Sequence, residues 1–320
     1  MIQAMTLFCA YLLDRLIGDP RFLPHPVVGM GRLITRLEIG IRAIGLKEKQ
    51  LKWAGLLFPL VLVGGSFLLV WLFLIGLSAI HPWLAWGVEV WLISTTIATK
   101  GLADAGMEIF RHLKSGQLAE ARKALSMVVG RDTENLDEPE ISRGAVETVA
   151  ENIVDAILSP LFYAAIGGAP LAMAYRAANT LDSMVGYKDE RYMNLGWASA
   201  RFDDWANYIP ARLAAAVLVV ACWIKGHNGT ASWQIVRRDA RLHPSPNSGF
   251  TEAGMAGALG IQLGGLNYYQ GVPSHRARLG DPLRPIRAQD IRETVQVMKL
   301  VSLLFLALVM IGRMGFEKFW

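Results

Sequence analysis

The stretch of sequence that decides the fold runs from Arg143 to Tyr187 and reads RGAVETVAENIVDAILSPLFYAAIGGAPLAMAYRAANTLDSMVGY. Three of its acidic residues, Glu147, Glu151 and Asp155, recur every four residues, so an α-helix would place them on one face. Like charges at this spacing repel each other by about 0.2–0.5 kcal/mol per pair. Because the residues between them are mostly apolar, the pattern predicts a helix whose acidic ladder faces a polar cavity.

This acidic ladder has two interpretations. A divalent metal ion would neutralise the three carboxylates, and carboxylate oxygens suit Mg²⁺ and Ca²⁺. The solvated face of an amphipathic helix explains the spacing equally well. The continuation favours the cavity, because Tyr175, Arg176, Asn179 and Asp182 follow with helical spacing on a second apolar segment.

The composition indicates a membrane protein. Hydrophobic residues make up 53% of the 320 residues and charged residues 18%, and the mean hydropathy is +0.32. An ordinary soluble domain is less apolar than this. We therefore predict an all-α, polytopic integral membrane protein that forms a single membrane-embedded domain over residues 1–320. We expect about four or five transmembrane helices, together with broken or re-entrant helices and cytoplasmic helical loops.

The net charge of +5 does not indicate nucleic-acid binding. The basic residues flank apolar spans, as the positive-inside rule describes, and they form no basic patch interleaved with aromatic residues. The two cysteines, Cys9 and Cys222, lie in apolar segments without a CxxC motif, which indicates core residues rather than a zinc site or a disulfide. No basic region precedes the first apolar segment, so we expect no cleavable signal peptide.

Apolar segments predict where the chain crosses the membrane. The clearest are Trp53–Ile80 and Val295–Gly312, and Trp83–Thr99 is expected to return from the first of these. Met1–Gly18 barely spans. Two further segments, Ile153–Ala174 and Ala211–Ile224, are broken or short, so we expect both to be re-entrant.

The polar segments between these spans predict the orientation. Residues 21–52 hold seven Lys and Arg, residues 225–292 hold nine, and the turn near Pro82 holds none. The positive-inside rule therefore places both basic segments in the cytoplasm and the N-terminus outside. We interpret the proline-rich stretch from Gly18 to Ile34 as an ordered loop, residues 100–136 as helical, and residues 225–294 as a long polar segment.

Common nucleotide and hydrolase motifs are absent from the sequence, which has no GxxxxGK[ST], GxSxG or HExxH, and no GxGxxG that follows a strand. Instead, acidic residues lie in or beside apolar segments: Asp14, Asp19, Asp132, Glu147, Glu151, Asp155, Asp182, Asp203, Asp204 and Glu252. Donors that suit phosphate accompany them: Arg131, Arg176, Arg201, Arg237, Arg238 and His243. The turn from Ser245 to Gly249 is either an anion cradle or an ordinary helix cap.

Four blocks of this sequence resemble the adenosylcobinamide-phosphate synthase family (CobD/CbiB), which are integral membrane proteins of cobalamin biosynthesis. The blocks are LLDRLIGDPRFLPHPVVGMGRLI (residues 12–34), VGRDTENLDEPEISRGAVETVAENIVDAILSPLFY (129–163), YRAANTLDSMVGYKDERYMNLGWASARFDDWANYIPARL (175–213) and RDARLHPSPNSGFTEAGMAGALGIQLGG (238–265). They cover most of the chain in the order found in the family.

The resemblance implies a reaction. Family members join adenosylcobyric acid to (R)-1-amino-2-propanol O-phosphate, or to ethanolamine phosphate, through an amide bond. The reaction is written with ATP as cosubstrate, which implies an acyl phosphate intermediate and Mg²⁺ to hold the polyphosphate. A base must also take a proton from the incoming ammonium group, and the choice between Glu151 and Asp182 stays open.

The resemblance also implies roles for the candidate residues. We expect Glu151, Asp182 and Asp132 to be catalytic. We expect the substrate and phosphate groups to contact Arg131, Arg176, Asn179, Arg201, Arg238, His243, Ser245, Asn247 and Ser248. We expect the metal ligands to be Glu147, Glu151, Asp155 and Asp203. The implied partners are the corrinoid, the amino-alcohol phosphate, membrane lipid and other membrane enzymes of the late pathway, with no nucleic acid.

Two other functions remain open. A non-catalytic membrane sensor or scaffold, similar to AmpE-like proteins, is the main alternative, but the acidic and basic positions occur together across the four blocks and favour the enzyme. A transporter would explain broken helices with embedded carboxylates, but the sequence shows no internal repeat of the kind transporters often have. For the enzyme we expect a multi-pass protein of the inner cell membrane whose active site faces the cytoplasm.

Overall fold

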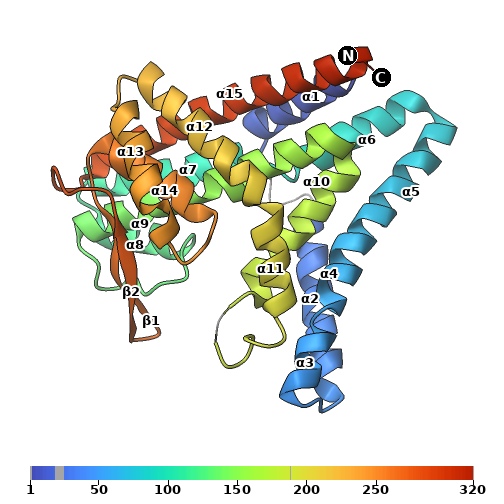
Figure 1. Ribbon diagram of the computed structural model, residues 1–320, viewed down its shortest axis with the longest axis horizontal. Coiled ribbons are helices and arrows are strands. Elements are labelled where there is room, and N and C mark those ends of the chain that lie inside the picture. The colour runs from blue at the N-terminus through green and yellow to red at the C-terminus, as the bar shows by residue number, and fades with distance from the viewer. Residues whose placement is uncertain (1, 19–24, 188, 320) are drawn as a thin grey trace. The chain divides into compact units, whose positions relative to one another are not determined.

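The structure of the chain is a computed structural model that describes residues 2–18, 25–187 and 189–319 (Figure 1). In these ranges the regular secondary structure is helical apart from one two-stranded sheet, so the predicted all-α class is confirmed. The elements are α1 (Ile2–Leu16), α2 (Pro26–Ala43), α3 (Glu48–Ala54), α4 (Leu57–Pro59), η1 (Leu60–Gly64), α5 (Gly65–Ile80), α6 (Pro82–Ser94), α7 (Thr99–Lys114), α8 (Leu118–Ser126), α9 (Glu138–Ile153), η2 (Val154–Leu158), α10 (Ser159–Val185), α11 (Trp197–Ala206), α12 (Tyr208–Ile224), α13 (Gly229–Asp239), η3 (Ala240–Leu242), α14 (Ser248–Leu259), β1 (Leu263–Tyr269), β2 (Val272–Leu279) and α15 (Ala288–Phe319).

Three helical stretches of the described chain are long and apolar enough to cross a membrane: Glu48–Ile80, Glu138–Val185 and Ala288–Gly315. A fourth is added if α11 and α12 form one broken span. The predicted spans Trp53–Ile80 and Val295–Gly312 lie within these stretches. By contrast, α1 has 15 residues and α6 has 13, fewer than the roughly 20 that a full crossing requires. The described chain is therefore a polytopic helical membrane protein with three candidate spans, or four with the broken pair, where four or five were expected.

The proline-rich stretch near the N-terminus is helical over more of its length than its composition suggested. Its residues 19–24 lie outside the described ranges, but α2 begins at Pro26 and contains Gly29 and Gly31, which we had expected in a loop. Proline suits the first position of a helix because its missing N–H has no partner there anyway. His25 is the N-cap, and its Nδ1 accepts a hydrogen bond from Val27 N at 3.2 Å.

The predicted break in the long central helix is confirmed at Gly167 and Gly168, where the backbone leaves the helical region. Gly168 has φ +62°, and a Cβ there would lie 2.4 Å from the Glu89 carboxylate of α6. The same carboxylate accepts a hydrogen bond from Ala169 N at 3.4 Å. Glu89 therefore satisfies a backbone donor that the broken helix leaves open, as a broken helix at membrane depth requires.

The internal contacts of the chain divide it into two compact units, each assembled from separate stretches of sequence. Unit 1 comprises residues 1–98, 159–207 and 306–320, and unit 2 comprises residues 99–158 and 208–305. In unit 1, α10 packs against α2, α5, α6 and α11. Helix α5, which belongs to this unit, exposes many large apolar side chains, as expected for a helix that faces lipid.

Unit 2 is built around α14, in which every residue except Phe250 is buried. Helices α9, α12 and α13 and the β1–β2 hairpin pack around it. Glycines allow this close packing: a Cβ at Gly254 would lie 2.4 Å from the Leu218 side chain, and a Cβ at Gly257 would lie 2.7 Å from the Ala231 carbonyl oxygen. The core of the unit therefore depends on small residues along one helix.

The β1–β2 hairpin was not predicted, since residues 225–294 showed only a polar pattern. The strands pair antiparallel and are joined by a two-residue turn at Gln270 and Gly271, with φ +52° and +77°. Positive φ at both central residues is typical of the tight hairpin turn that follows the twist of its strands. The hairpin carries several of the residues that contact the acidic face of α9.

Candidate active site

The first part of the acidic face of α9 is an ion-pair cluster around Glu147, whose side chain is only 5% exposed. Its carboxylate pairs with the guanidinium groups of Arg131 and Arg143 and accepts a hydrogen bond from Gly264 N at 2.8 Å. Arg131 also donates to Asn267 Oδ1, and Arg143 donates to the Gly264 carbonyl oxygen. These contacts join α9 to the segment before it and to β1, so Glu147 and Arg131 have a structural function here.

Asp132, which we expected to be catalytic, holds the tip of the hairpin. Its two carboxylate oxygens accept hydrogen bonds from Gln270 N at 2.9 Å and Gly271 N at 2.8 Å. Its own N–H donates to the Tyr268 carbonyl oxygen at 2.8 Å. Because both oxygens bind backbone donors, the structure gives Asp132 the geometry of a turn cap rather than of a base.

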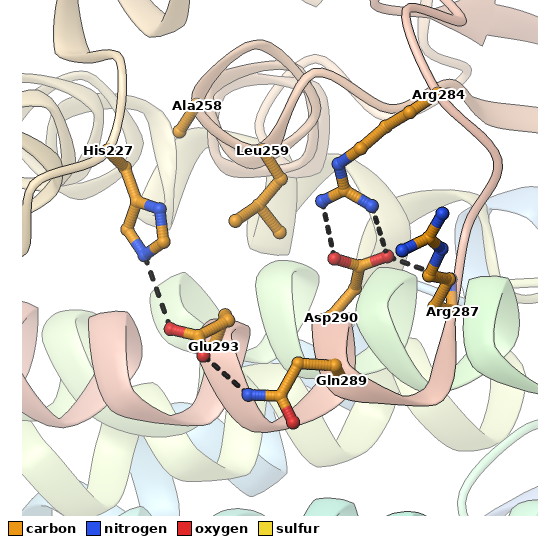
Figure 2. Close-up of a pocket in the computed structure, with 8 residues that line it drawn as sticks. All are labelled: His227, Ala258, Leu259, Arg284, Arg287, Gln289, Asp290 and Glu293. Carbon is orange, nitrogen blue, oxygen red and sulfur yellow. Dashed lines mark hydrogen bonds and ion pairs between the residues drawn. The ribbon is translucent and has the colours of Figure 1, made fainter.

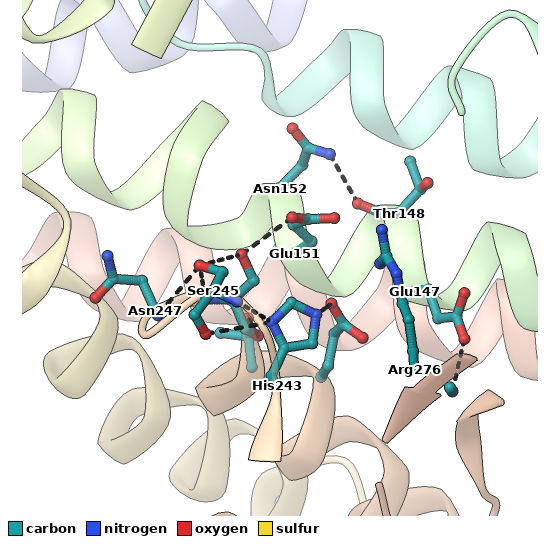
Figure 3. Close-up of polar contacts among 12 residues, drawn as sticks. Glu147, Thr148, Glu151, Asn152, His243, Ser245, Asn247 and Arg276 are labelled. Atoms are coloured by element: carbon teal, nitrogen blue, oxygen red, sulfur yellow. Dashed lines mark hydrogen bonds and ion pairs between the residues drawn. The ribbon is translucent and has the colours of Figure 1, made fainter. Parts of the chain in front are cut away.

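Glu151 lies one helical turn beyond Glu147 and has very different surroundings (Figure 3). It is half-buried, and its Oε1 accepts a hydrogen bond from the Ser248 hydroxyl at 3.0 Å. Ser248 also contacts Ser245 Oγ at 3.2 Å. No arginine forms an ion pair with Glu151 in the part of the chain that the structure describes, so its negative charge is balanced less completely than that of Glu147.

The turn from Ser245 to Gly249 uses its own backbone donors. Ser245 Oγ accepts hydrogen bonds from Asn247 N at 3.3 Å and Ser248 N at 3.2 Å. The Asn247 side chain accepts from Arg212 at 3.1 Å. Of the two interpretations of this turn, the geometry therefore favours the helix cap, since the donors that an anion would need are already occupied.

His243 and Glu252 form a buried ion pair behind this turn, with His243 Nε2 3.2 Å from Glu252 Oε1. Their side chains are 6% and 3% exposed. Burial alone would lower the pKa of His243, but Glu252 and the nearby Glu151 raise it above its ordinary value. Burial raises the pKa of Glu252 to about 7, although His243 opposes this change. The pair is therefore able to gain or lose a proton close to neutral pH.

Arg276, which the sequence analysis missed, extends from β2 toward this acidic group. Figure 3 shows its side chain running beside Glu147 toward Glu151. Its guanidinium donates to the Tyr269 hydroxyl at 2.9 Å, and it interacts electrostatically with Glu151, Glu252 and Glu147. We call Glu151, His243, Ser245, Ser248, Glu252 and Arg276 the acid–histidine cluster. The sequence offered no signal for Arg276 because its strand was not recognised.

The predicted metal ligands of unit 2, Glu147, Glu151 and Asp155, form no metal-binding group in the described part of the chain. Glu147 is neutralised by two arginines, and Asp155 lies in η2, a π-helical turn. The i→i+5 hydrogen bonds of a π-turn change the spacing, so a residue four positions on no longer lies beneath the one before. Across the described ranges, no group of three or more His, Cys, Asp or Glu side chains is placed to hold a metal ion. The ladder therefore does not fit a metal site built from protein ligands alone.

The remaining acidic candidates form a second polar group in unit 1, centred on Asn207. Asn207 Nδ2 donates to the buried Asp203 carboxylate at 3.0 Å. Its Oδ1 accepts from the Ser159 hydroxyl at 2.6 Å and the Tyr175 hydroxyl at 2.8 Å. Tyr163 stacks on Tyr175 with ring centroids 5.2 Å apart. The sequence pointed to Asp203, but not to the amide that connects it to these aromatic residues.

Four further candidates lie near this Asn207 group. Asp182 interacts electrostatically with Asp203, and Arg176 donates to Asn179 Oδ1 at 3.4 Å. These three residues lie on α10, as their helical spacing predicted. Arg201 differs, because its side chain is 63% exposed and is 4.0 Å from Asp204, which is the geometry of a surface charge.

Arg238, predicted to bind phosphate, already has two partners. Its guanidinium donates to Asp239 at 2.6 Å and to Asp281 at 2.9 Å. Asp239 is buried and also accepts from Gly280 N at 2.8 Å. This network joins α13 to the end of β2, and it accounts for Arg238 without a ligand.

Together, the fold and these side chains define a class: a polytopic helical membrane protein that buries an acid–histidine pair beside a half-exposed carboxylate. Comparison with known proteins places the chain within this class. Residues 7–298 match the model of the CobD/Cbib protein family. The chain therefore belongs to the CobD/Cbib family, which confirms the resemblance stated from its sequence blocks.

Individual relatives agree with this assignment. The chain is 50% identical over 289 residues, 90% of each protein, to the cobalamin biosynthesis protein CobD of Geobacter metallireducens. It is 48% identical over 306 residues, 96% of each protein, to the cobalamin biosynthesis protein CbiB of Salmonella typhimurium. CobD of Yersinia enterocolitica is 47% identical over 301 residues, 94% of this chain and 95% of that protein. No solved structure matches the chain.

Proposed function

We propose that this protein acts in cobalamin biosynthesis as an adenosylcobinamide-phosphate synthase, an ATP-dependent ligase that joins a corrinoid carboxylic acid to an amino-alcohol phosphate. Membership of the CobD/Cbib family supports the pathway. The observation that carries the chemistry is the half-exposed Glu151 beside the buried His243–Glu252 pair. Amide formation releases a proton from the amine, and this arrangement supplies an acceptor for it.

Glu151 receives the ammonium group of the amino-alcohol phosphate in this proposal. Its carboxylate is half-buried and lacks the arginines that neutralise Glu147, so it attracts a cation. When His243 and Glu252 together carry a negative charge, their field adds to the attraction of the ammonium group to Glu151. Glu151 then takes one proton from the ammonium, and the free amine attacks the activated carboxyl group. This assigns the base that the sequence left open between Glu151 and Asp182.

ATP and Mg²⁺ belong to the proposal through the family. ATP transfers its γ-phosphoryl group to the corrinoid carboxylate, the amine displaces phosphate, and the products are the amide, ADP and phosphate. Mg²⁺ supplies charge neutralisation on the polyphosphate, and it commonly uses only one or two protein carboxylates together with phosphate oxygens. Asp182 and Asp203 in unit 1 are carboxylates that suit such a role, whereas Glu147 in unit 2 does not, because two arginines already pair with it.

Phosphate groups need cationic partners that are not already neutralised. Arg276 fits this requirement best in unit 2, since its guanidinium donates a hydrogen bond to a neutral tyrosine hydroxyl and lies beside Glu151 without a direct ion pair. Arg176 on α10, which donates to Asn179 Oδ1, stays a phosphate-binding candidate in unit 1 through the family resemblance. Charge-assisted hydrogen bonds to phosphate each contribute about 1.5–3 kcal/mol. We therefore expect Arg276→Ala to raise the KM for a phosphorylated substrate more than that for the corrinoid.

We also propose an inner-membrane location with the site facing the cytoplasm, because ATP is available there. The basic residues before the span Glu48–Ile80 support this orientation. Cysteines are introduced at two exposed positions, Lys49 in the first turn of that stretch and Trp83 just beyond its end. An impermeant thiol reagent outside the membrane should label Trp83→Cys and not Lys49→Cys, and the reverse pattern would overturn the orientation.

The activity itself is tested with purified full-length protein in detergent or a bilayer. We expect ATP consumption and amide formation only when a corrinoid carboxylic acid and an amino-alcohol phosphate are both present. Mass spectrometry of the corrinoid product and a coupled ADP assay measure the two outcomes. If no amide forms under any nucleotide condition, the ligase proposal is wrong and a sensor or scaffold function gains support.

A further inference from the structure

An apolar cavity lies in unit 1, where η1, α10 and α11 provide its walls. Its volume is about 250 Å³, and its lining residues are Val63, Tyr163, Leu171, Ala174, Tyr175, Phe202, Trp205 and Ala206. None of these side chains is charged. Ligand pockets span roughly 300–1,000 Å³, so this smaller cavity suits part of a molecule, such as a single hydrocarbon chain.

A cavity of the opposite character lies in unit 2, between the α12–α13 turn, the end of α14 and the start of α15 (Figure 2). There the polar side chains already pair with one another, Arg284 with Asp290, and Glu293 with His227 and Gln289. The cavity of unit 1 has no charged wall. Its ligand is therefore recognised by apolar contacts rather than by charge.

Two of the lining residues of this apolar cavity are stacked tyrosines. The rings of Tyr163 and Tyr175 lie with their centroids 5.2 Å apart and their planes 12° apart. The Tyr163 hydroxyl donates to the Ala206 carbonyl oxygen at 2.9 Å, and the Tyr175 hydroxyl donates to Asn207 Oδ1 at 2.8 Å. Because both hydroxyls are bonded within the protein, the rings are fixed and offer the cavity their apolar carbon atoms. The cavity is therefore preformed for a hydrocarbon group.

The cavity is continuous with the lipid-facing surface of unit 1. Trp205 and Phe202 are 78% and 39% exposed, so the wall that they form is partly open. On η1, Val63 follows three residues after Leu60, which is 69% exposed and belongs to the candidate membrane span Glu48–Ile80. Tryptophan is enriched where lipid headgroups meet the hydrocarbon of a membrane. Lipid chains are therefore the molecules that surround the open wall.

A cationic group lies one turn of α11 before this open wall. Arg201 precedes Trp205 by four residues, which places both side chains on the same face of the helix. The Arg201 side chain is 63% exposed, and its nitrogen lies 4.0 Å from the Asp204 carboxylate, at the outer limit of an ion pair. Arginine binds phosphate through charge-assisted hydrogen bonds. This face of α11 therefore combines a phosphate-binding group with an apolar wall.

We propose that this cavity binds one acyl chain of a membrane phospholipid, whose phosphate contacts Arg201. A free phosphate leaves the apolar walls without a partner, and a simple hydrocarbon leaves the guanidinium without one, whereas a phospholipid matches both. The chain lies against Trp205 and the stacked Tyr163 and Tyr175, enclosed by three elements instead of one helix face. It therefore exchanges more slowly than the lipids along α5. Neither substrate of the proposed reaction takes part in this binding.

Photochemical labelling tests the site. Full-length protein is placed in phosphatidylcholine nanodiscs with increasing fractions of phosphatidylglycerol that carries a diazirine in one acyl chain, and mass spectrometry maps the labelled residues. Labelling of Phe202 and Trp205 should saturate at a probe fraction at least about tenfold lower than labelling of Leu69, because only the cavity adds a phosphate contact. Leu69 is a lipid-facing residue of α5 that is 68% exposed. Labelling that rises in parallel at all three positions would overturn the site.

A variant that fills the cavity locates the binding. Ala206→Leu adds bulk to the wall on α11 and should abolish the early saturation at Phe202. Ala200→Leu is the matched control, because Ala200 is also half-buried on α11 but does not line the cavity, and it should leave the saturation unchanged. Unchanged saturation in Ala206→Leu would refute the site. Thermal denaturation of each variant establishes that it is folded.

A second pair of variants decides the question if Ala206→Leu does not fold. Trp205→Ala removes a wall residue that is 78% exposed, and Trp53→Ala removes a side chain that is 73% exposed but does not line the cavity. Only Trp205→Ala should abolish the early saturation at Phe202. Equal behaviour of these two variants would contradict the assignment.

A diacylglycerol probe with the same acyl chains tests the phosphate contact, because it lacks the phosphate. Arg201→Ala should raise the phosphatidylglycerol fraction at half-saturation at least about tenfold, and it should leave the diacylglycerol fraction unchanged. Arg36→Ala removes an exposed arginine of α2 and should change neither fraction. A loss shared by both probes in Arg201→Ala, or a loss with neither, would overturn the contact between Arg201 and the lipid phosphate.

Discussion

Two carboxylates one turn apart on α9 have opposite surroundings, although their spacing in the sequence treats them alike. Glu147 is paired with two arginines and a backbone amide. Glu151 is half-buried and accepts a hydrogen bond from one serine hydroxyl, with the His243–Glu252 pair nearby. The first carboxylate is compensated by two cations and a backbone donor, whereas the second accepts a hydrogen bond from a neutral hydroxyl.

The two carboxylates share a helix face but differ in the number of donors that contact them. This number, rather than the position on the face, distinguishes the structural carboxylate Glu147 from the reactive carboxylate Glu151. A buried ion pair contributes little net stability, but removal of one partner leaves an uncompensated charge. Glu147 should therefore matter for folding and Glu151 for chemistry. The predictions below test this separation.

The largest effect is expected for Glu151→Gln. Glutamine keeps the shape of the side chain and can still accept from Ser248, but it cannot take a proton. Turnover should fall at least about 100-fold, in line with the usual contribution of a general base. The measurement is the rate of amide formation, and the thermal midpoint should stay close to that of the native protein.

The companion variant Glu147→Gln shows whether this loss is specific to the reactive position. It removes the same charge one turn away, so it should reduce stability more than turnover per folded molecule. Near-normal turnover in Glu151→Gln would contradict the proposed base and would return Asp182 to consideration.

The next effect concerns stability. Glu147→Ala should destabilise the protein by about 3–5 kcal/mol, because Arg131 and Arg143 lose their shared partner in a buried position. Thermal or denaturant unfolding in detergent measures it. The exposed control Glu120→Ala should change stability by no more than about 0.5 kcal/mol. Equal effects of the two variants would show that the ion-pair cluster around Glu147 does not stabilise the fold.

A smaller effect is expected in the pH dependence of turnover. Burial raises the pKa of Glu252 to about 7, so the His243–Glu252 pair takes up a proton as the pH falls through this range. The protonated pair no longer adds negative charge beside the position that receives the ammonium group, so turnover should decrease below about pH 7. His243 lowers the pKa of Glu252, so His243→Gln should move this decrease to higher pH. A profile that keeps its midpoint in the variant would exclude the pair as its source.

The sequence predicted much of the fold for clear physical reasons. Long uncharged segments have few alternatives to membrane spans, and the Gly167–Gly168 break followed from residues that a straight helix disfavours. The hairpin was missed because Gln270, rather than glycine or asparagine, occupies the first turn position with positive φ. The helical start of α2 was missed because its prolines were interpreted only as helix breakers.

The candidate site was less predictable, because its properties depend on partners distant in the sequence. Arg131 lies 16 residues before Glu147, and Gly264 lies 117 residues after it. The third carboxylate of the ladder, Asp155, lies in a π-helical turn that no residue pattern predicted. His243 and Glu252 were both named as polar candidates. Their pairing, however, depends on the turn around Ser245, whose backbone N–H donates to His243 Nδ1 and whose hydroxyl accepts from Asn247 N.

The smallest effect is expected for Arg238→Ala, which tests whether a surface ion pair also binds substrate. The Arg238 side chain is 52% exposed, and its two carboxylate partners already occupy it. We expect a stability loss of about 1 kcal/mol and a KM for the amino-alcohol phosphate within about twofold of the native value. Asp281→Ala, which removes only the exposed partner, should cost less.

The pH dependence of this loss identifies its cause. Arg238 lowers the pKa of Asp239 by hydrogen bonding, against the opposing effect of burial. A carboxyl group with a lowered pKa stabilises the fold above its unfolded pKa, and that contribution disappears as the pH falls through the folded value. The difference between native protein and Arg238→Ala should therefore be full near neutral pH and shrink in acid. A rise of tenfold or more in KM, at unchanged stability, would instead restore Arg238 as a phosphate ligand and place it with the reactive residues rather than with Glu147.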